Sequence, residues 1–194
     1  KPFRIYREAK KLPVSQYDIV LCDYEFITSL ACQLKRKKMV NFGHQASFQS
    51  DITPRPFHKN KLGEWILKNY CKGSFNIGFH FHQYTNWIFP PIVKNTLWEQ
   101  KPKIEPFVTV YLPHYSQIEI EKYLKSLQKI SFKIFSKEIS KTVVQNNLTW
   151  IPIDNLLFAD SILNCHGVIT GAGFETPAEC LFLKKKLMVL PIKG

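Results

Sequence analysis

The sequence predicts an α/β protein with two domains, each built on a parallel β-sheet, and three observations support this prediction. Apolar runs rich in β-branched residues alternate with helix-length segments along most of the chain. The alternation is most regular from residue 107 onward. The dipeptide Pro90-Pro91 interrupts the pattern, so we expect it to separate domains 1–90 and 91–194. Strands and helices that alternate in this way favour parallel strands joined by right-handed crossovers.

In the first domain the pattern begins with a strand–helix–strand unit. The polar stretch that follows, residues 46–62, contains Pro54 and Pro56 and is predicted as a loop. The aromatic and proline-rich stretch 73–104 predicts only patchy regular structure. The predicted elements of this domain are, in order, strand 18–22 (DIVLC), helix 25–35, strand 39–42 (MVNF) and helix 62–70.

The second domain continues with a cleaner alternation, which is typical of a Rossmann-like nucleotide-binding domain. Ligands of such sheets bind at the carboxyl ends of the strands. No unit precedes the first strand–helix–strand unit, and no closing helix follows the last strand, so we expect the N-terminal domain, and the end of the C-terminal one, to be incomplete in this chain. The predicted elements are strands 107–112 (FVTVYL), 131–136 (SFKIFS), 148–151 (LTWI), 166–170 (HGVIT) and 186–190 (KLMVL), with helices 116–129, 154–163 and 177–183.

The composition is that of a globular protein with a substantial core and a basic surface. Of 194 residues, 45% are hydrophobic, and 27 Lys and Arg against 15 Asp and Glu give a formal charge of +12. This charge favours anionic partners such as phosphates, nucleic acid or acidic lipid headgroups, without choosing among them. The five cysteines form no CxxC pair and show no zinc-ligand spacing, which predicts reduced thiols and a cytoplasmic location. No apolar run has the length of a membrane span, so any membrane contact is expected to be peripheral.

The most informative segment is TGAGFETPAE at residues 170–179, between a predicted strand and a predicted helix. The small residues 171–173 allow the backbone to approach a ligand, and the helix start offers N–H groups and a positive dipole end. This arrangement predicts a diphosphate-binding turn. Thr176 suits the N-cap, Pro177 the first helical position and Glu179 the third, which together form a capping box. Glu179 could instead accept hydrogen bonds from a ribose diol, and the sequence leaves both roles open.

The motif Gly173-x-x-Thr176-x-x-Glu179, followed by an apolar helix and a strand ending in Val-Leu-Pro, resembles the donor-binding signature of glycosyltransferase family 28. That family includes the lipid-linked N-acetylglucosaminyltransferase of peptidoglycan synthesis, and the motif is also similar to bacterial and archaeal proteins grouped as family-28-like. The resemblance implies GT-B architecture, with two Rossmann-like domains around a cleft. It also implies metal-independent transfer of a sugar from a nucleotide-diphosphate sugar, with a UDP-sugar preferred, to a lipid-linked or polysaccharide acceptor.

The same resemblance implies which residues bind the donor. Glu179 would hold the ribose, and the glycine turn would face the diphosphate. The loop WIPIDNLL at 150–157 is similar to one whose backbone reads the uracil edge, which points to the main chain of Ile153. The turn PHYSQ at 113–117 stands where the family has a Gly-rich Ser-Gln loop; its glycines are absent here. The donor-binding residues implied by the resemblance are Gly171, Ala172, Gly173, Phe174, Thr176, Glu179, Ile153 and Ser116.

The first domain resembles the acceptor domain of that family through the segments 18–25 (DIVLCDYE) and 41–45 (NFGHQ). The resemblance makes Asp23, Glu25 and His44 candidate catalytic residues at strand ends that face the cleft. There a carboxylate or a histidine would deprotonate the acceptor hydroxyl. Helix N-capping and first-turn charge placement also explain Asp23 and Glu25, and ordinary loop polarity also explains His44. The sequence does not choose between these roles.

Two other clusters have ordinary explanations. The run FHFH at 79–82 would place His80 and His82 on one face of a strand, but no third ligand has a suitable spacing, so we expect no metal site. Lysine-rich runs at 35–38 and 184–186 follow predicted helices, where cations offset the helix dipole. Such patches could also rest on the anionic inner face of a membrane. We expect neither a cofactor nor a nucleic-acid partner.

Two alternatives to a transferase stay open from sequence. A nucleotide-sugar 2-epimerase shares the fold and the donor signature but needs no separate acceptor. A non-catalytic protein that binds nucleic acid or an acidic membrane would explain the charge of +12, and its binding would depend steeply on salt. The expected partners of the leading interpretation are a nucleotide-sugar donor and a lipid-linked or glycan acceptor.

Overall fold

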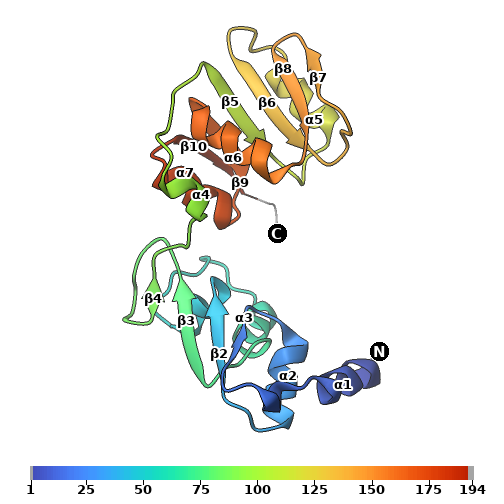
Figure 1. Cartoon of the computed structure of the whole chain (residues 1–194), viewed down its shortest axis with the longest axis vertical. Helices are drawn as coiled ribbons and strands as arrows, with labels where there is room; N and C mark the ends of the chain where they lie inside the picture. Colours follow the sequence, from blue (N-terminus) through green and yellow to red (C-terminus); the bar gives the residue numbers. More distant parts are fainter. Residues whose placement is uncertain (1, 192–194) are drawn as a thin grey trace. The chain divides into compact units, whose positions relative to one another are not determined.

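The computed structural model describes residues 2–191, which fold into two compact units (Figure 1). The first unit ends at Ile92 and the second begins at Val93. Each unit is an α/β structure with its own sheet of mainly parallel strands, so the predicted fold class is confirmed. Among the described residues, no helix combines the length and the apolar character that a membrane span requires.

The first unit is built on a four-stranded sheet in the order β1-β2-β3-β4. Neighbouring strands are parallel: Cys22 is in register with Asn41, and Gly43 with Gly78. The carboxyl ends of β1, β2 and β3 therefore lie at one edge of the sheet. The elements are α1 (Pro2–Lys11), the 3-10 helix η1 (Val14–Gln16), β1 (Val20–Cys22), α2 (Phe26–Leu34), β2 (Met39–Gly43), the 3-10 helix η2 (Gln45–Gln49), α3 (Lys61–Asn69), β3 (Phe75–Phe79) and β4 (Ile88–Phe89).

The stretch 73–104, predicted to have patchy regular structure, contains three short elements: β3, β4 and the helix α4 (Asn95–Trp98). Gly78 helps to explain why the sequence did not predict strand β3 individually. Glycine weakens a strand pattern, but a Cβ at Gly78 would lie 2.7 Å from the Cα of Ser47 in η2. The glycine that makes the strand difficult to recognise in the sequence is also the residue that allows η2 to pack against it.

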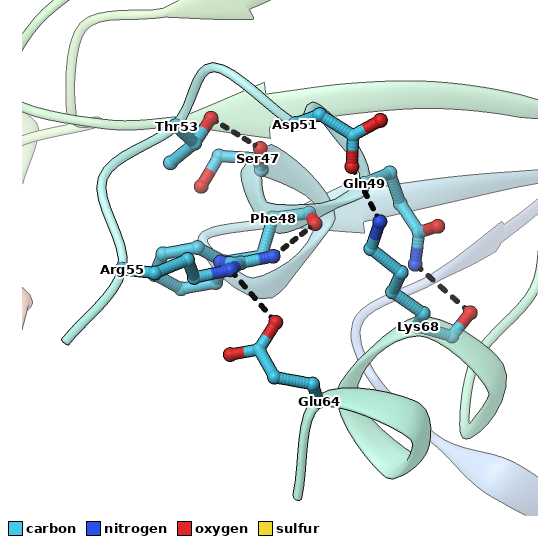
Figure 2. A network of polar contacts seen from close by, with 8 residues as sticks. All are labelled: Ser47, Phe48, Gln49, Asp51, Thr53, Arg55, Glu64 and Lys68. Atoms are coloured by element: carbon cyan, nitrogen blue, oxygen red, sulfur yellow. Dashed lines mark hydrogen bonds and ion pairs between the residues drawn. The ribbon is translucent and has the colours of Figure 1, made fainter. Parts of the chain in front are cut away.

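A network of polar contacts holds the segment 46–62, which was predicted as a loop (Figure 2). The side chain of Arg55 is only 8% exposed and pairs with Glu64 of α3, with 3.1 Å between Nε and Oε2. The same guanidinium donates to the Phe48 carbonyl and lies 4.4 Å from the centre of the Phe48 ring. Thr53 donates to the Ser47 carbonyl at 2.7 Å. These contacts tie η2, and with it the end of β2, to α3.

The second unit is built on a six-stranded sheet in the order β10-β9-β5-β6-β8-β7. Among the described strands, β7 alone runs antiparallel to its neighbour; it is an exposed edge strand that the sequence did not predict. Helix α5 is also shorter than predicted and ends at Leu124. The elements after α4 are β5 (Phe107–Tyr111), α5 (Gln117–Leu124), β6 (Ser131–Ser136), β7 (Val143–Gln145), β8 (Leu148–Pro152), α6 (Asn155–Asn164), β9 (Gly167–Gly171), α7 (Glu175–Phe182) and β10 (Lys186–Leu190).

Two apolar layers cover this sheet. One face packs against α4, α6 and α7 through residues such as Leu97, Ile162 and Cys180, while the other packs against α5 through Ile120. From β5 the chain passes to β6 and β8 on one side and then returns to β9 and β10 on the other. The strand order therefore reverses between β5 and β9, and the crevice outside the carboxyl ends of those strands is the place where open α/β sheets bind ligands.

Candidate functional site

The turn after β9 leads into α7 two residues earlier than predicted. Helix α7 begins at Glu175 and its N-cap is Phe174, whose ring cannot accept the capping hydrogen bond. Thr176 and Pro177 are therefore the second and third helical residues, and Glu179 is the fifth. The predictions of an N-cap at Thr176 and of a capping box with Glu179 were wrong, because the helix extends to the end of the glycine turn.

Glu179 is a buried carboxylate, 4% exposed, and its partner is Lys94 at the start of α4. The Nζ of Lys94 lies 3.3 Å from Oε1 of Glu179, and the lysine side chain is half exposed. A carboxylate is costly to bury unless a cation or hydrogen-bond donors compensate its charge, and Lys94 does so here. Sequence reasoning missed Lys94, because it lies in a proline-rich segment without a recognisable motif.

A cavity of about 130 Å³ lies beside this ion pair, at the carboxyl ends of β5, β6 and β8. It brings Ile153, Thr176 and Glu179 together, three of the residues predicted to bind the donor. The rings of Tyr111 and Phe135 contact that of Phe158 and provide an apolar wall. The lining consists of Lys94, Tyr111, Phe135, Ile153, Asp154, Asn155, Phe158, Glu175, Thr176 and Glu179.

The glycine turn at residues 171–174 is not part of this lining, but its two glycines border open space. Among the described atoms, nothing lies within 4 Å of a Cβ built on Gly173, and only the Leu190 carbonyl, at 4.0 Å, approaches one on Gly171. Neither glycine has a positive φ. Packing and backbone conformation therefore do not require glycine here, and the turn leaves open space next to the start of α7.

Two further residues of the predicted donor site, Ser116 and Ile153, lie at or next to the N-cap of a helix. Ser116 is the N-cap of α5: its Oγ accepts from the Glu119 backbone at 3.3 Å, and the Glu119 carboxylate accepts from the Ser116 backbone at 2.8 Å. The hydrogen bonds from Ser116 lower the pKa of the Glu119 carboxyl. Ile153 precedes Asp154, which caps α6 through Leu156 and Leu157 at 2.9 Å each. Ser116 lies outside the cavity, and Ile153 lines it.

In the first unit, the three candidate catalytic residues lie near the carboxyl ends of β1 and β2. Glu25 is the N-cap of α2, where its two carboxylate oxygens accept from Ile27 at 2.8 Å and Thr28 at 2.6 Å. Burial works to raise the pKa of Glu25, but these hydrogen bonds outweigh it and lower the pKa. The capping role left open for Glu25 is therefore present, and it makes this carboxylate a weak base. Asp23 does not cap the helix in this arrangement, since Glu25 does.

Asp23 instead lies against Gly43 at the end of β2. A Cβ on Gly43 would collide with Oδ1 of Asp23, and Gly43 has a φ of +132°, a conformation that strongly favours glycine. The next residue along the chain is His44. The parallel register of β1 and β2 thus places Asp23 beside the backbone that presents His44.

His44 lies among aromatic rings and beside a second histidine. Its Nδ1 is 2.8 Å from the Phe79 carbonyl, which requires Nδ1 to carry the proton and makes Nε2 the basic nitrogen. The imidazole of His80 lies 5.5 Å away between ring centres, and the Phe48 ring 5.0 Å away. Burial lowers the pKa of His44, and the hydrogen bond with Phe79 partly offsets this effect.

Sequence reasoning considered His80 only as a metal ligand, on the condition that residues 79–82 form a strand. Strand β3 ends at Phe79, so His80 follows the strand. Burial, and then the proximity of His44 and His82, lower the pKa of His80, and its Nδ1 has no hydrogen-bond partner among the described residues. Among these residues there is also no group of three or more side chains that could hold a metal ion.

A larger cavity in the second unit, of about 690 Å³, has a different character. It lies between α5 and the sheet and is lined mainly by aliphatic side chains of β5, β9 and β10, among them Val110, Ile169 and Leu190. Its charged lining residues are Glu119 and Lys186, and the rest of the lining is mainly apolar. The smaller cavity beside Glu179, which polar and charged side chains line, is therefore the better candidate for a polar ligand despite its size.

The two parallel sheets with helices packed on them place the protein in the class of Rossmann-like α/β proteins. The comparison with protein families narrows this class, because the family model for glycosyl transferase family 1 matches residues 10–194. The chain belongs to this family, which is of the GT-B type, and is a glycosyltransferase that requires a sugar donor and an acceptor. The comparison with curated proteins gave no match.

Proposed function

We propose that the protein transfers a sugar from a nucleotide-diphosphate sugar, with UDP as the nucleotide, to a lipid-linked or polysaccharide acceptor without a metal ion. The observation that carries this proposal is the buried carboxylate of Glu179 in a cavity at the carboxyl ends of the second sheet. A buried anion that faces a ligand cavity suits a ribose diol, whose two hydroxyl groups donate hydrogen bonds. The family-28-like motif supports the same role for Glu179.

The diphosphate would bind at the glycine turn and the start of α7. The open space at Gly173 allows phosphate oxygens to approach the backbone, and the helix dipole favours their charge. Pro177 has no N–H, so the donors of the first turn are those of Glu175 and Thr176. The carboxylates of Glu175 and Asp154 also line the cavity and oppose an anion, so Lys94 is the lining cation that offsets them. These groups would stabilise the leaving diphosphate in place of a metal ion.

The acceptor hydroxyl would be activated in the first unit, with His44 as the base that the structure favours over Glu25. A base must be unprotonated and must hold its lone pair toward the substrate. The lowered pKa of His44 keeps its imidazole neutral near pH 7, and the hydrogen bond to Phe79 makes Nε2 the basic nitrogen. Asp23 lies beside the same backbone and stays the second candidate.

A basic hollow in the first unit supports contact with an anionic membrane. Its volume is about 260 Å³, and its lining includes Arg36, Lys37, Lys38 and Lys72 at the amino ends of β2 and β3. The candidate catalytic residues of this unit lie instead near the carboxyl ends of its strands. Each basic side chain near an anionic surface contributes on the order of 1 kcal/mol to binding. We propose a cytoplasmic enzyme that rests peripherally on the membrane to reach a lipid-linked acceptor.

A thermal-shift titration tests the donor site directly. The protein is titrated with UDP, GDP, dTDP, CMP and ADP, with and without EDTA, because a ligand of the folded state raises the melting temperature. We expect selective stabilisation by UDP that survives EDTA. Glu179→Ala removes charged hydrogen bonds of about 1.5–3 kcal/mol and should weaken UDP binding about 10- to 100-fold.

The matched control is Glu121→Ala on α5, which removes a carboxylate outside the cavity and should leave UDP binding unchanged. A shift by every nucleotide alike would contradict the choice of UDP, and dependence on a divalent ion would contradict the metal-independent mechanism. If no nucleotide binds, the proposed donor site is wrong.

A further inference from the structure

The thiols of Cys22 and Cys71 are in contact in the first unit, although 49 positions separate them in the sequence. Cys22 is the last residue of β1, and Cys71 follows the end of α3. Their Sγ atoms lie 3.1 Å apart, with Cys71 donating to Cys22, and Cys22 in turn donates to the Glu25 carbonyl at 3.1 Å. The sulfur atoms would have to approach by about 1 Å to reach the length of a disulfide bond.

The other three cysteines, Cys32, Cys165 and Cys180, are just as buried but are placed differently. Within the described chain, none of them has a hydrogen bond to another sulfur atom. Cys165, for example, donates to the Ile162 carbonyl at 3.4 Å. The pairing of Cys22 with Cys71 is therefore a specific feature of the fold and not a general consequence of burial, and these three thiols serve as internal controls.

The two thiols of the pair differ in acidity. The hydrogen bond from Cys71 lowers the pKa of Cys22 to about 7, against burial and the charges of Glu25 and Asp23, which raise it. The same hydrogen bond, together with burial, raises the pKa of Cys71. The thiolate is the nucleophilic form of cysteine, so Cys22 is suited to attack an oxidant and Cys71 to attack the oxidised Cys22 afterwards.

We propose that Cys22 and Cys71 form a reversible disulfide when hydrogen peroxide oxidises the protein. The Cys22 thiolate attacks one peroxide oxygen, the O–O bond breaks, and hydroxide leaves, which gives a sulfenic acid at Cys22. The Cys71 sulfur then attacks the Cys22 sulfur, the S–O bond breaks, and the oxygen departs as water with the proton of Cys71. In sum, two thiols and one peroxide give one disulfide and two waters.

Aromatic rings pack beside the buried pair. Cys22 is 2% exposed and Cys71 is fully buried. The ring of Tyr70 contacts those of Tyr24 and Phe26, at 4.9 and 5.2 Å between centres, and Tyr24 packs on the core cluster that contains both thiols. Tyr24 has a φ of +46°, which is unfavourable for a residue other than glycine, so opening this turn relieves strain. Peroxide is close to water in size, and we expect it to react faster than bulky glutathione disulfide.

Peptide mapping of the whole protein tests the proposal. The reduced protein is treated with hydrogen peroxide, denatured, alkylated and digested, and the thiols are read out by mass spectrometry. We expect one cross-linked peptide that joins Cys22 to Cys71 and disappears after reduction with dithiothreitol, while the other three cysteines stay alkylated. Cys32→Ser should keep the cross-link. Cys71→Ser should stop the reaction at a Cys22 sulfenic acid, which dimedone traps.

The proposal is overturned if both thiols of the wild-type protein stay alkylated after peroxide, if Cys22 pairs with another cysteine, or if it proceeds to sulfinic acid. The wild-type map decides even if Cys71→Ser does not fold, which circular dichroism would show. The readout involves neither nucleotide nor sugar transfer, so its outcome is independent of the proposed enzymatic function.

Discussion

The two units present functional groups at the same place in similar sheets, but the groups differ in charge. In the second unit, the carboxyl ends of the strands surround a buried carboxylate that is paired with a half-exposed lysine. In the first unit, the corresponding edge carries two histidines among aromatic rings, and burial lowers the pKa of both. One site keeps its charges by pairing them, whereas the other keeps its two histidines neutral.

This difference teaches which kind of ligand each edge can accept. A charged pair beside a cavity can exchange partners with the hydroxyl groups and phosphates of a nucleotide. A neutral imidazole in an apolar surrounding cannot hold an anion strongly, but it can take a proton from a hydroxyl group. The division of labour in the proposed transfer follows from these environments, and each prediction below tests one side of it.

The largest effect is expected from His44→Gln, which tests whether the first unit supplies the base and the second unit binds the donor. Loss of a general base lowers a rate by about 100- to 10,000-fold, while UDP binding in the other unit should stay unchanged. UDP release with a lipid-linked acceptor measures the rate, and the thermal shift measures binding. Equal losses of rate and of UDP affinity would contradict the assignment of separate roles.

The lowered pKa of His44 also predicts how the stability of the folded protein depends on pH. Burial lowers the pKa of His44 below 6.5 in the folded protein. As the pH falls, His44 is therefore protonated at a higher pH in the unfolded chain than in the folded one. The stabilising contribution is therefore present above pH 6.5 and is lost as the pH falls through the folded pKa. Proton NMR of the imidazole should give a midpoint below 6.5 for His44, and His44→Gln should raise the pKa of His80.

A second prediction concerns what holds the histidine edge in place. Arg55→Met removes a guanidinium that is 8% exposed and ties Phe48 to α3, as Figure 2 shows. Because Glu64 keeps access to water, we expect a loss of about 1–3 kcal/mol in unfolding free energy. Lys68→Met breaks the ion pair with Asp51 in the same network, but that pair is exposed and screened by water, so its loss should destabilise the protein much less. Urea denaturation measures both, and equal losses would show that burial of the pair does not matter.

The contrast between the units also explains what the sequence could predict. The parallel strands of the second unit are regular apolar runs, so their positions were predicted closely, whereas the exposed antiparallel strand β7 was not predicted. The glycine turn and Glu179 stand in one continuous motif, which made the candidate donor site visible. Lys94 was missed because its position opposite Glu179 depends on how α4 packs on the sheet, and no local pattern encodes that contact.

The first unit was harder to interpret for a related reason. Its functional edge combines Asp23, His44 and His80 from the ends of three strands, and only the register of the sheet brings them together. The pairing of Cys22 with Cys71 likewise depends on tertiary packing, since their spacing resembles no redox motif. Helix starts were also uncertain: the same Thr-Pro dipeptide that is typical of an N-cap lies inside α7, because Phe174 already has a helical backbone.

The smallest effect on folding is expected at Gly173. Its substitution is compared with the same substitution at Gly43 in the first unit. Gly173→Ala adds a methyl group where no described atom lies within 4 Å, so the unfolding free energy should change by less than about 0.5 kcal/mol. Gly43→Ala is the matched substitution in the first unit. There the positive φ and the collision with Asp23 should cost about 1–3 kcal/mol. Urea denaturation of both variants, with UDP titration of Gly173→Ala, separates folding from binding. A stable Gly173→Ala protein with weakened UDP binding would mean that the open space serves the ligand, whereas unchanged binding would place the diphosphate elsewhere.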